Sequence, residues 1–434
     1  MKFKNFFDLF FGHLNKKKIQ YCILRNYSSF PSSNESNDID ILVSQKNLSK
    51  IIKFLNKNFL IVNFNERKNV KTFFISGVND TKKESIQIDL LTELTWKGLS
   101  YLKNNQIFDN IRYYKQNKLI KVPSKKHEKI ITLFSSYLVG GWINLKYQHD
   151  IKDYFCKKKK LVLIELQKIL NKKLATDIVE SVIIDNNKKL LKLLTKIKLV
   201  IIYKNLINNP LQFFYSIYEH YKFELIIRFT NYPLNQFCIL GVDGVGKSTI
   251  IKSIIYKLKG NSKNIIKVHL KHDFFKKRNI EHKNPHTKKK RSIFFSFLKM
   301  IYWIVGYYLK NNIHGYKNST IIIWDRYIFD IFVDQLRYRL NLPDKLINII
   351  SFLTPSPDHT FVLIDDPLKI YKRKKELSLN DLKYYNEKYI DLQKKLTNTS
   401  IVTLSNKNNV SDIIVFKIQK ILQKKNYYKY KKFL

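Results

Sequence analysis

Apolar and polar positions change their spacing twice along the chain. In residues 1–125, short β-type runs separated by polar turns predict an α+β domain with one helical segment. The turn-like stretch Ser76–Lys83 separates the last two runs. The predicted strands are Ile19–Leu24, Asp38–Val43, Thr72–Ile75 and Ser85–Leu91, and the predicted helix is Leu48–Leu55.

Residues 126–234 carry apolar side chains at intervals of three and four, which is the spacing of one helix face. Strand-like runs are few here, so we expect a helical connecting region. The predicted helices are His127–Leu138, Leu161–Leu170, Leu174–Ile184 and Lys189–Ile202.

Residues 235–434 alternate strand-like and helical runs, an order typical of a parallel sheet covered on both faces. This segment is therefore predicted to be an α/β domain. Its basic, aromatic tail, Lys424–Lys432, is expected to be a frayed end. The predicted strands are Phe237–Leu240, Ile265–Leu270, Ser319–Trp324, Thr360–Ile364 and Ser400–Leu404, and the predicted helices are Lys247–Leu258 and Ile293–Leu309.

A phosphate-binding loop is the strongest chemical signal. Residues 241–249 read Gly-Val-Asp-Gly-Val-Gly-Lys-Ser-Thr, follow an apolar strand and precede a helix. Glycines let the backbone wrap a phosphate chain, and the helix presents its positive end to it. Lys247 is predicted to neutralise the β- and γ-phosphates of ATP, and Ser248 to offer a hydroxyl to Mg²⁺. The predicted nucleotide-binding residues are Gly241, Asp243, Gly244, Val245, Gly246, Lys247, Ser248 and Thr249.

A second signal stands at the end of the strand at Ser319–Trp324. Asp325 and Arg326 follow it, at the sheet edge where open α/β folds bind ligands. Asp325 can hold Mg²⁺ through water or accept the acceptor's proton, and Arg326 can clamp a phosphate. Taken alone, the two residues are more typical of a surface ion pair at a strand end.

Together these motifs resemble thymidylate kinase and its nucleotide-kinase relatives over residues 235–434. The Gly-x-Asp-Gly-x-Gly-Lys-Ser form, Asp325-Arg326-Tyr327 and Ser356–Asp365 carry the resemblance, and the basic run Lys372–Glu376 stands where the family has its lid. The resemblance implies a five-stranded parallel sheet, with ATP and Mg²⁺ as cofactors.

The resemblance also implies roles for single residues. Asp243 would approach the acceptor's sugar, Arg326 would hold its phosphate, and Gln335 would help read its base. Because the loop has Val242 and Val245 and no arginine, Arg373 of the lid would stabilise the negative charge on the phosphoryl group during its transfer.

Two acids depart from the family pattern. Asp330 and Asp334 replace a small polar and an aromatic residue, and with Arg326 they are expected to share one helix face. This spacing fits an intrahelical ion pair or a rebuilt acceptor pocket. The second interpretation argues against dTMP as the acceptor.

The first domain holds three acids on predicted strands. Asp38 and Asp40 share one face of a strand because strand side chains alternate, and Asp89 lies on another strand. Three converging carboxylates, with Asp38 and Asp40 as the leading metal ligands, suit two-metal nucleotidyl transfer. A pair of strand-start acids in a loop is the plainer alternative.

The segment around these acids resembles nucleotidyltransferase-like domains of the kanamycin-transferase and polymerase-β kind, over about residues 18–100. Those domains carry a Gly-Ser phosphate-binding turn, which this sequence lacks. Arg25 or the serines Ser32, Ser33 and Ser36 would substitute for it, or else the domain binds a nucleotide without transferring it. His127 and His149, in the helical extension that follows, are expected to be solvated or capping residues rather than ligands.

Composition adds a strong charge. Lys and Arg number 80 against 34 Asp and Glu, a net charge of +46. This suits an anionic membrane surface or phosphorylated substrates, although codon bias is the favoured explanation. Nucleic acid is not favoured, since no known binding motif accompanies the charge. Three scattered cysteines and no convincing targeting segment predict a cytoplasmic protein. Ile293–Leu309 leaves peripheral membrane contact open, and a homodimer is also left open.

We therefore predict an ATP-dependent phosphotransferase that acts on a nucleotide or related phosphate or hydroxyl acceptor. A nucleotidyltransferase-like domain precedes it, which makes a bifunctional enzyme a further expectation. The alternative is a regulatory nucleotide-binding module that docks on a membrane or polyanion without turnover.

Overall fold

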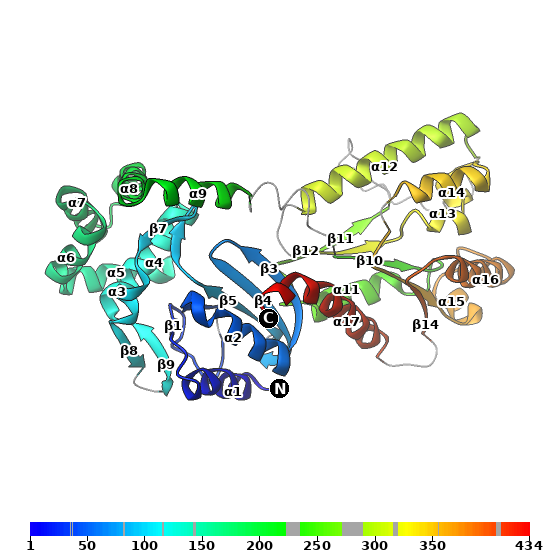
Figure 1. The fold of residues 1–434 in the computed structure, drawn as a ribbon. Coiled ribbons are helices and arrows are strands. Elements are labelled where there is room, and N and C mark those ends of the chain that lie inside the picture. The colour runs from blue at the N-terminus through cyan, green and yellow to red at the C-terminus, as the bar shows by residue number, and fades with distance from the viewer. Residues whose placement is uncertain are drawn as a thin grey trace. The chain divides into compact units, whose positions relative to one another are not determined.

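The computed structural model describes residues 1–34, 36, 38–80, 83–114, 117–141, 145–222, 235–270, 290–315, 320–354, 356–404 and 409–434. The chain divides into two compact units (Figure 1). The first comprises Met1–Ile227 and Tyr427–Leu434, and the second comprises Arg228–Asn426. Most of the predicted helical region 126–234 therefore belongs to the first unit.

The first unit is built on a mixed five-stranded sheet with the strand order β1-β2-β5-β4-β3. β2 pairs with β5 in parallel, and the other neighbours are antiparallel. The predicted runs at Ile19–Leu24, Asp38–Val43 and Ser85–Leu91 correspond to β1, β2 and β5. The strands are β1 (Tyr21–Ile23), β2 (Asp38–Val43), β3 (Leu60–Arg67), β4 (Val70–Asp80) and β5 (Lys83–Leu91).

Two expectations in this sheet were wrong. Most of the predicted turn Ser76–Lys83 is strand, since β4 continues to Asp80 and β5 already begins at Lys83. The strand β3 was missed, although residues 62–65 read Val-Asn-Phe-Asn and alternate apolar with polar. Both faces of the strand are buried in the structure, including the polar face with Asn63 and Asn65.

Two helices, α1 (Phe3–Lys16) and α2 (Gln45–Asn58), contribute to the core of this sheet. The phenylalanines of α1 recur at intervals of three and four, so they form one buried face. Phe6, Phe7, Phe10 and Phe11 are fully buried in the cluster that also holds Phe64 and Phe73 of the sheet.

Beyond the sheet, the first unit continues as two hairpins and a set of helices around a second apolar cluster. The hairpins are β6 (Leu94–Trp96) with β7 (Leu99–Leu102) and β8 (Ile111–Tyr114) with β9 (Asn117–Pro123). The helices are α3 (Asn104–Phe108), α4 (Lys125–Ser135), the π-helical turn η1 (Ser136–Gly140), α5 (Leu145–Lys157), α6 (Lys159–Ile169), α7 (Lys172–Ile183), α8 (Asn187–Asn208) and α9 (Pro210–Tyr221).

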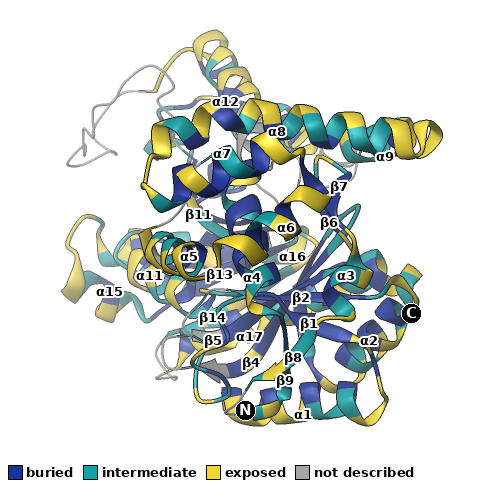
Figure 2. Cartoon of the chain, turned by 90° about the vertical axis from the view of Figure 1, so that its left-hand side faces the viewer, coloured by how far each residue is buried: buried dark blue, intermediate teal, exposed yellow. Residues whose placement is uncertain are grey.

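The second unit is a five-stranded sheet with the strand order β11-β12-β10-β13-β14, and every neighbouring pair is parallel. The predicted α/β class and the five predicted strands are confirmed. The central strands β10, β12 and β13 are almost wholly buried (Figure 2). The strands are β10 (Asn235–Leu240), β11 (Asn264–His269), β12 (Thr320–Asp325), β13 (His359–Ile364) and β14 (Thr399–Thr403).

Helices follow the strands of this sheet and supply the rest of its core. The predicted helices at Lys247–Leu258 and Ile293–Leu309 are confirmed as α11 and α12. The helices are α11 (Lys247–Lys257), α12 (Ile293–Gly315), α13 (Asp330–Val333), η4 (Leu336–Tyr338), α14 (Asp344–Phe352), α15 (Pro367–Arg373), α16 (Leu379–Lys395) and α17 (Val410–Tyr430), which η5 (Lys431–Phe433) follows.

The expected frayed end at Lys424–Lys432 was wrong. α17 runs through this tail to Tyr430, whose side chain is 1% exposed. The Tyr430 ring packs against Phe64 and Phe73 of the first unit, and its hydroxyl donates to Asn56 Oδ1 at 2.9 Å. Burial of this aromatic ring stabilises an end that its basic composition marks as solvated.

Candidate active site

The loop between β10 and α11 has the backbone that its glycines predicted. Gly241, Gly244 and Gly246 have φ of 141°, 83° and 103°, a region that residues with a side chain rarely adopt. A Cβ atom on Gly241 would also lie 2.6 Å from the carbonyl oxygen of Leu363 on the neighbouring strand. Glycine is therefore required at this position both by conformation and by space.

Lys247 is the first residue of α11 and is buried, at 7% exposure. Its Nζ donates to the carbonyl oxygens of Gly241 and Val242 at 2.8 and 2.7 Å, so it lies across the loop. Burial lowers the pKa of Lys247 to about 7, and the positive charge of Arg326 acts in the same direction. Lys247 and Arg326 thus place positive charge close together at the loop, and a bound anion would offset their repulsion and the cost of burying them.

Asp325 ends β12, the strand next to β10, as predicted. Its carboxylate pairs with Lys267 Nζ of β11 at 2.7 Å, a partner that the sequence did not suggest. Ser248 is exposed at the start of α11. Hydroxyl and carboxylate oxygens are the ligands that Mg²⁺ prefers, so the donor set of Ser248 and Asp325 fits this ion.

Arg326 does not share a helix face with Asp330 and Asp334, which corrects that expectation. Arg326 has a φ of 70°, and α13 begins only at Asp330 and ends at Val333. Its backbone N–H instead donates to Ile239 O of β10 at 3.1 Å. The predicted Arg326–Asp330 ion pair nevertheless forms, through the turn before the helix.

Asp243 of the loop is held by two arginines. The guanidinium groups of Arg326 and Arg337 donate to different oxygens of its carboxylate. Burial opposes ionisation, but Arg326, Lys247 and Arg337 together keep the pKa of Asp243 well below its usual range.

Arg337 was missed by the sequence reasoning. Its Nε is buried without a hydrogen-bond partner in the structure. The signal that could have found it is the row of arginines at 337 and 339 directly after the acids of this segment.

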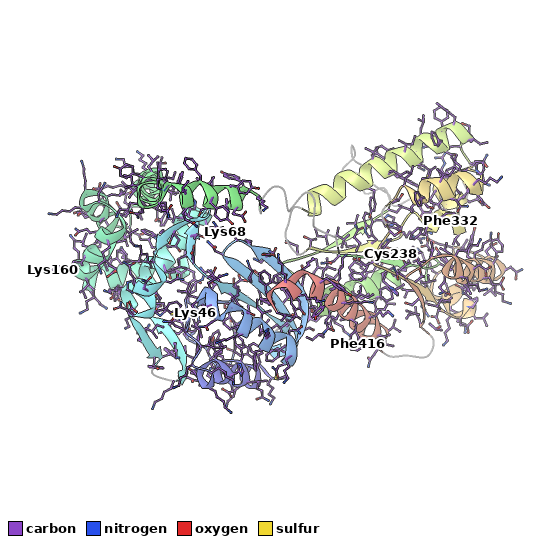
Figure 3. All side chains as sticks on the ribbon, in the orientation of Figure 1. Lys46, Lys68, Lys160, Cys238, Phe332 and Phe416 are labelled. Carbon is purple, nitrogen blue, oxygen red and sulfur yellow. The ribbon has the colours of Figure 1, made fainter. Side chains whose placement is uncertain are left out.

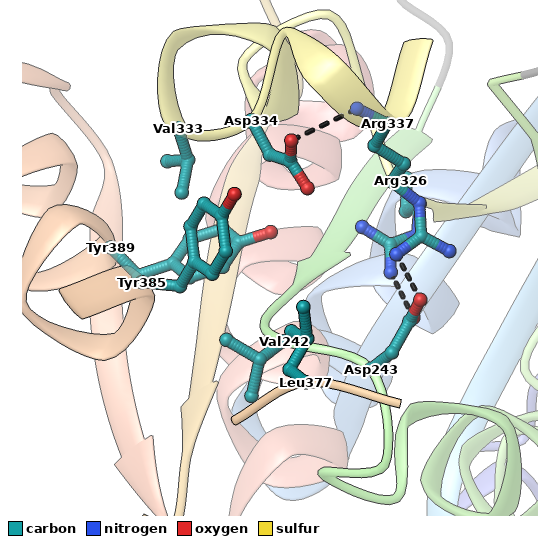
Figure 4. Close-up of a pocket in the computed structure, with 9 residues that line it drawn as sticks. All are labelled: Val242, Asp243, Arg326, Val333, Asp334, Arg337, Leu377, Tyr385 and Tyr389. Atoms are coloured by element: carbon teal, nitrogen blue, oxygen red, sulfur yellow. Dashed lines mark hydrogen bonds and ion pairs between the residues drawn. The ribbon is translucent and has the colours of Figure 1, made fainter. Parts of the chain in front are cut away.

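A small pocket opens beside this charge network (Figure 4). The two arginines lie on one side of it, and the aromatic rings of Tyr385 and Tyr389 lie on the other. Both tyrosines belong to α16 and were not anticipated from the sequence. The lining residues are Val242, Asp243, Arg326, Val333, Asp334, Arg337, Leu377, Tyr385 and Tyr389.

Asp330 is completely buried behind the pocket. It accepts hydrogen bonds from Arg326, Tyr338 and Tyr389. These donors keep the pKa of Asp330 below its usual value although burial acts in the opposite direction. Asp330 therefore holds Arg326 in position, whereas Asp334 reaches the pocket itself.

Two further predicted residues lie beside this centre. The side-chain amide of Gln335 donates to Leu342 O and accepts from Leu342 N, so both its ends hold the following loop. Arg373, at the end of α15, pairs with Asp365 and approaches Val245 O of the phosphate loop at 3.4 Å. Arg373 and the glycine loop are thus neighbours in space, 128 residues apart.

The three acids of the first unit converge. Asp40 of β2 stands opposite Asp89 of β5 in the parallel register, and Asp38 lies two residues earlier on the same face. One carboxylate oxygen from each lies within 4.8 Å of the others, which is close enough to hold a metal ion. Among the residues that the structure describes, these three acids are the one group of acidic, histidine or cysteine side chains placed closely enough to share a metal ion.

Asp40 and Asp89 each accept a hydrogen bond from a neighbouring side chain. Arg25, directly after β1, donates from Nε to Asp40 Oδ2 at 2.6 Å, and Gln87 Nε2 lies 3.1 Å from both oxygens of Asp89. Arg25 thus stands at the turn where a phosphate-binding group was expected. Of the two histidines, His127 is buried against Glu165 at 3.0 Å, and His149 is exposed.

Comparisons with known proteins give little information about the function of this chain. No protein-family model matches the chain, and no curated protein does. Two solved structures that align are thymidylate kinases. The one from Candida albicans is 19% identical, covers 44% of this chain and 92% of its own, and has a TM-score of 0.31. The one from Ehrlichia chaffeensis is 18% identical, covers 44% and 100%, and has a TM-score of 0.29. TM-scores this low leave the function to be inferred from the site's own residues.

Proposed function

We propose that the second unit is an ATP-dependent phosphotransferase. It moves the γ-phosphoryl group of ATP to a phosphate or hydroxyl oxygen of a nucleotide or related acceptor. The observation that carries this proposal is buried Lys247, held across a glycine loop between a central parallel strand and a helix N-terminus. Asp325 at the end of the adjacent strand supports it.

The geometry suggests how the charges would be handled. The loop's N–H groups and Lys247 would bind the β- and γ-phosphates, with Ser248 and Asp325 as the residues to hold Mg²⁺. Mg²⁺, when bound, neutralises negative charge on the phosphates of ATP and orients the triphosphate. The acceptor oxygen forms a bond to the γ-phosphorus as the bond to the β-phosphate oxygen breaks. Arg373, near Val245, is suited to stabilise that transferring group.

The acceptor would enter the pocket beside Asp243. This pocket is narrow, and its lining side chains leave little enclosed space. An acceptor phosphate would therefore replace the carboxylate of Asp243 on Arg326 and Arg337, and the pocket would widen as it entered. Asp334 adds negative charge at its rim, which supports an acceptor other than dTMP.

The test is ATP turnover by the full chain with Mg²⁺ and a panel of nucleoside monophosphates, nucleosides and sugar phosphates. Lys247→Ala is expected to lower turnover at least a thousandfold, because it removes charge stabilisation worth several kcal/mol. Lys252→Ala, an exposed lysine on the same helix, serves as the matched control. Turnover by Lys247→Ala at the wild-type rate would refute the proposal. Tight ATP binding without turnover on any acceptor would favour a regulatory nucleotide-binding module.

We also propose that the first unit carries a nucleotidyl-transfer site at Asp38, Asp40 and Asp89. Their convergence within 4.8 Å favours it, because three close carboxylates repel each other without a cation. Oxygen donors of this kind fit Mg²⁺ or Mn²⁺. Arg25 would then bind a phosphate of the nucleotide. Its contact with Asp40 argues for a closed, structural ion pair instead.

Mn²⁺ binding distinguishes these two interpretations. Calorimetry on the full chain is expected to detect a Mn²⁺ site that Asp89→Asn removes and that Asp8→Asn, an exposed acid on α1, leaves intact. Transfer of a labelled nucleoside monophosphate from its triphosphate should disappear in the same variant. Equal Mn²⁺ binding by both variants would mean that the acids serve structure alone.

A further inference from the structure

The helices α8 and α9 each carry apolar side chains on two opposite faces. The first face is buried: Leu190, Leu193, Ile197 and Ile201 of α8 and Phe213 of α9 belong to the core of the first unit. The second face points to solvent, where a surface helix normally has polar residues. We call this second face the α8–α9 stripe. It consists of Leu199, Tyr203, Ile207, Leu211, Phe214 and Tyr218, which are between 56% and 85% exposed.

The stripe follows helical spacing and is not a scatter of single residues. Leu199, Tyr203 and Ile207 are four residues apart, so they line one face of α8. Leu211, Phe214 and Tyr218 follow at intervals of three and four on α9. Within each helix these exposed apolar side chains therefore share a face, which marks an interaction surface, whereas isolated ones need no explanation.

Both helices are anchored to the first unit, so the stripe belongs to a fixed surface. Asn205 Nδ2 of α8 donates to Ser100 O of the β6–β7 hairpin at 2.9 Å (Figure 1). On α9, the backbone at Ser216 comes so close to Gly98 that a Cβ there would lie 2.6 Å from Ser216 O. The face of α9 that holds Ser216 therefore packs on the turn at Gly98, whereas Leu211, Phe214 and Tyr218 are exposed.

Positive charge accompanies the stripe. Residues 187–222 contain seven lysines and a single acid, Glu219. Lys188, Lys192 and Lys196 are exposed and again four residues apart, so they continue the same face of α8 toward its N-terminus. Near the stripe, Lys68, which Figure 3 labels in the turn between β3 and β4, places its Nζ 5.2 Å from the ring of Tyr215 of α9.

We propose that the α8–α9 stripe docks the protein on an anionic membrane surface. Leucine, isoleucine, phenylalanine and tyrosine side chains can enter the boundary between headgroups and acyl chains, while adjacent lysines contact acidic headgroups. The aliphatic residues favour a bilayer over nucleic acid, for which aromatic stacking alone would suffice. This contact is peripheral: no helix in the described part of the chain has the length and hydropathy that crossing a bilayer requires.

Flotation of the full chain with lipid vesicles tests this proposal. Wild-type protein is expected to float with phosphatidylcholine vesicles that contain about one third phosphatidylserine, and not with phosphatidylcholine alone. Raising the salt from about 0.1 to about 0.5 M should weaken binding, because it screens the lysines. The variant Lys188→Gln/Lys192→Gln/Lys196→Gln should lose about fivefold per lysine, on the order of a hundredfold in all.

The apolar part has its own variant and its own control. Tyr203→Ser/Phe214→Ser/Tyr218→Ser is expected to lose about tenfold or more of vesicle affinity. Phe294→Ser/Ile301→Ser/Val305→Ser changes three exposed apolar residues of α12 instead and should bind as the wild type does. Because all six side chains are solvent-exposed, both variants should keep the wild-type circular dichroism and ATP turnover.

Several outcomes would overturn the proposal. These are equal binding to neutral and anionic vesicles, a loss confined to the α12 variant, and preferential binding of a short RNA or DNA duplex over anionic vesicles. A lipid-free dimer that the apolar variant dissociates would assign the stripe to a second copy of the chain.

Discussion

Replacing Lys247 by methionine is expected to abolish phosphoryl transfer and, at the same time, to change how the stability of the second unit depends on pH. Methionine fills a similar volume without the charge. In the wild type, burial lowers the pKa of this lysine from 10.5 to about 7. Between those two values the unfolded chain binds a proton at Lys247 that the folded chain has lost, so folding stability must rise with pH.

The size of the effect follows from these two pKa values. Linkage between a folded pKa of about 7 and an unfolded pKa of 10.5 makes the wild type about 2 kcal/mol more stable at pH 9 than at pH 7. Lys247→Met lacks this contribution. It also leaves the carbonyls of Gly241 and Val242 without their donor, which costs about 1 kcal/mol each at any pH. The pH-dependent part of the difference therefore isolates the buried charge.

Urea unfolding at pH 7 and pH 9 measures this difference in a background in which Trp96 and Trp142 of the first unit are replaced by phenylalanine. The fluorescence of the buried Trp303 and Trp324 then reports on the second unit. Relative to wild type, Lys247→Met should lose about 2 kcal/mol between the two pH values. Lys252→Met, at an exposed position of the same helix, should follow the wild type. If the free energy of unfolding of Lys247→Met differed from that of the wild type by the same amount at both pH values, the pKa of Lys247 would not be lowered by folding. The conclusion that its buried charge destabilises the fold would then be wrong.

Three other predictions test separate parts of the structure. Gly241→Ala should lower the melting temperature of the second unit and weaken ATP binding measured by calorimetry, because the new Cβ would meet Leu363 O; unchanged binding would mean that the loop has another conformation. Arg337→Ala should raise the KM for the acceptor at least tenfold with little change in the KM for ATP, since Arg337 holds Asp243 on the acceptor side; an effect on ATP alone would contradict this. Glu165→Gln should destabilise the first unit by about 2 kcal/mol at pH 7 in urea unfolding, because neighbouring basic side chains lower the pKa of this buried carboxyl to about 2. That stabilisation is present above pH 4.5 and is lost as the pH falls toward 2, so a pH-independent difference would count against it.

The sequence was most informative where local chemistry decides structure. The glycine loop at 241–249 requires positive φ angles that glycine supplies, and the apolar runs of the second unit are typical of buried parallel strands. Alternation on β2 put Asp38 and Asp40 on one face before any pairing was known. These features depend on neighbours within a few residues, so a single sequence carries them.

The sequence was less informative where distant segments meet. Arg337 and Arg326 share Asp243 across more than 80 residues, and Tyr389 reaches Asp330 across 59, so no local pattern marks them as one pocket. The left-handed backbone at Arg326 broke the expected helix face in the same region.

The sequence by itself determined the glycine loop at 241–249, the class of the second unit and the shared face of Asp38 and Asp40, because glycine conformation, apolar period and strand alternation are local properties. Only the tertiary structure decided which groups surround each charge. It paired Asp40 with Arg25, covered Tyr430 at an end that composition marks as solvated, and left the α8–α9 stripe exposed although its residues are apolar. The physical reason is that burial and ion pairing depend on which surfaces meet, and that is a property of the whole fold.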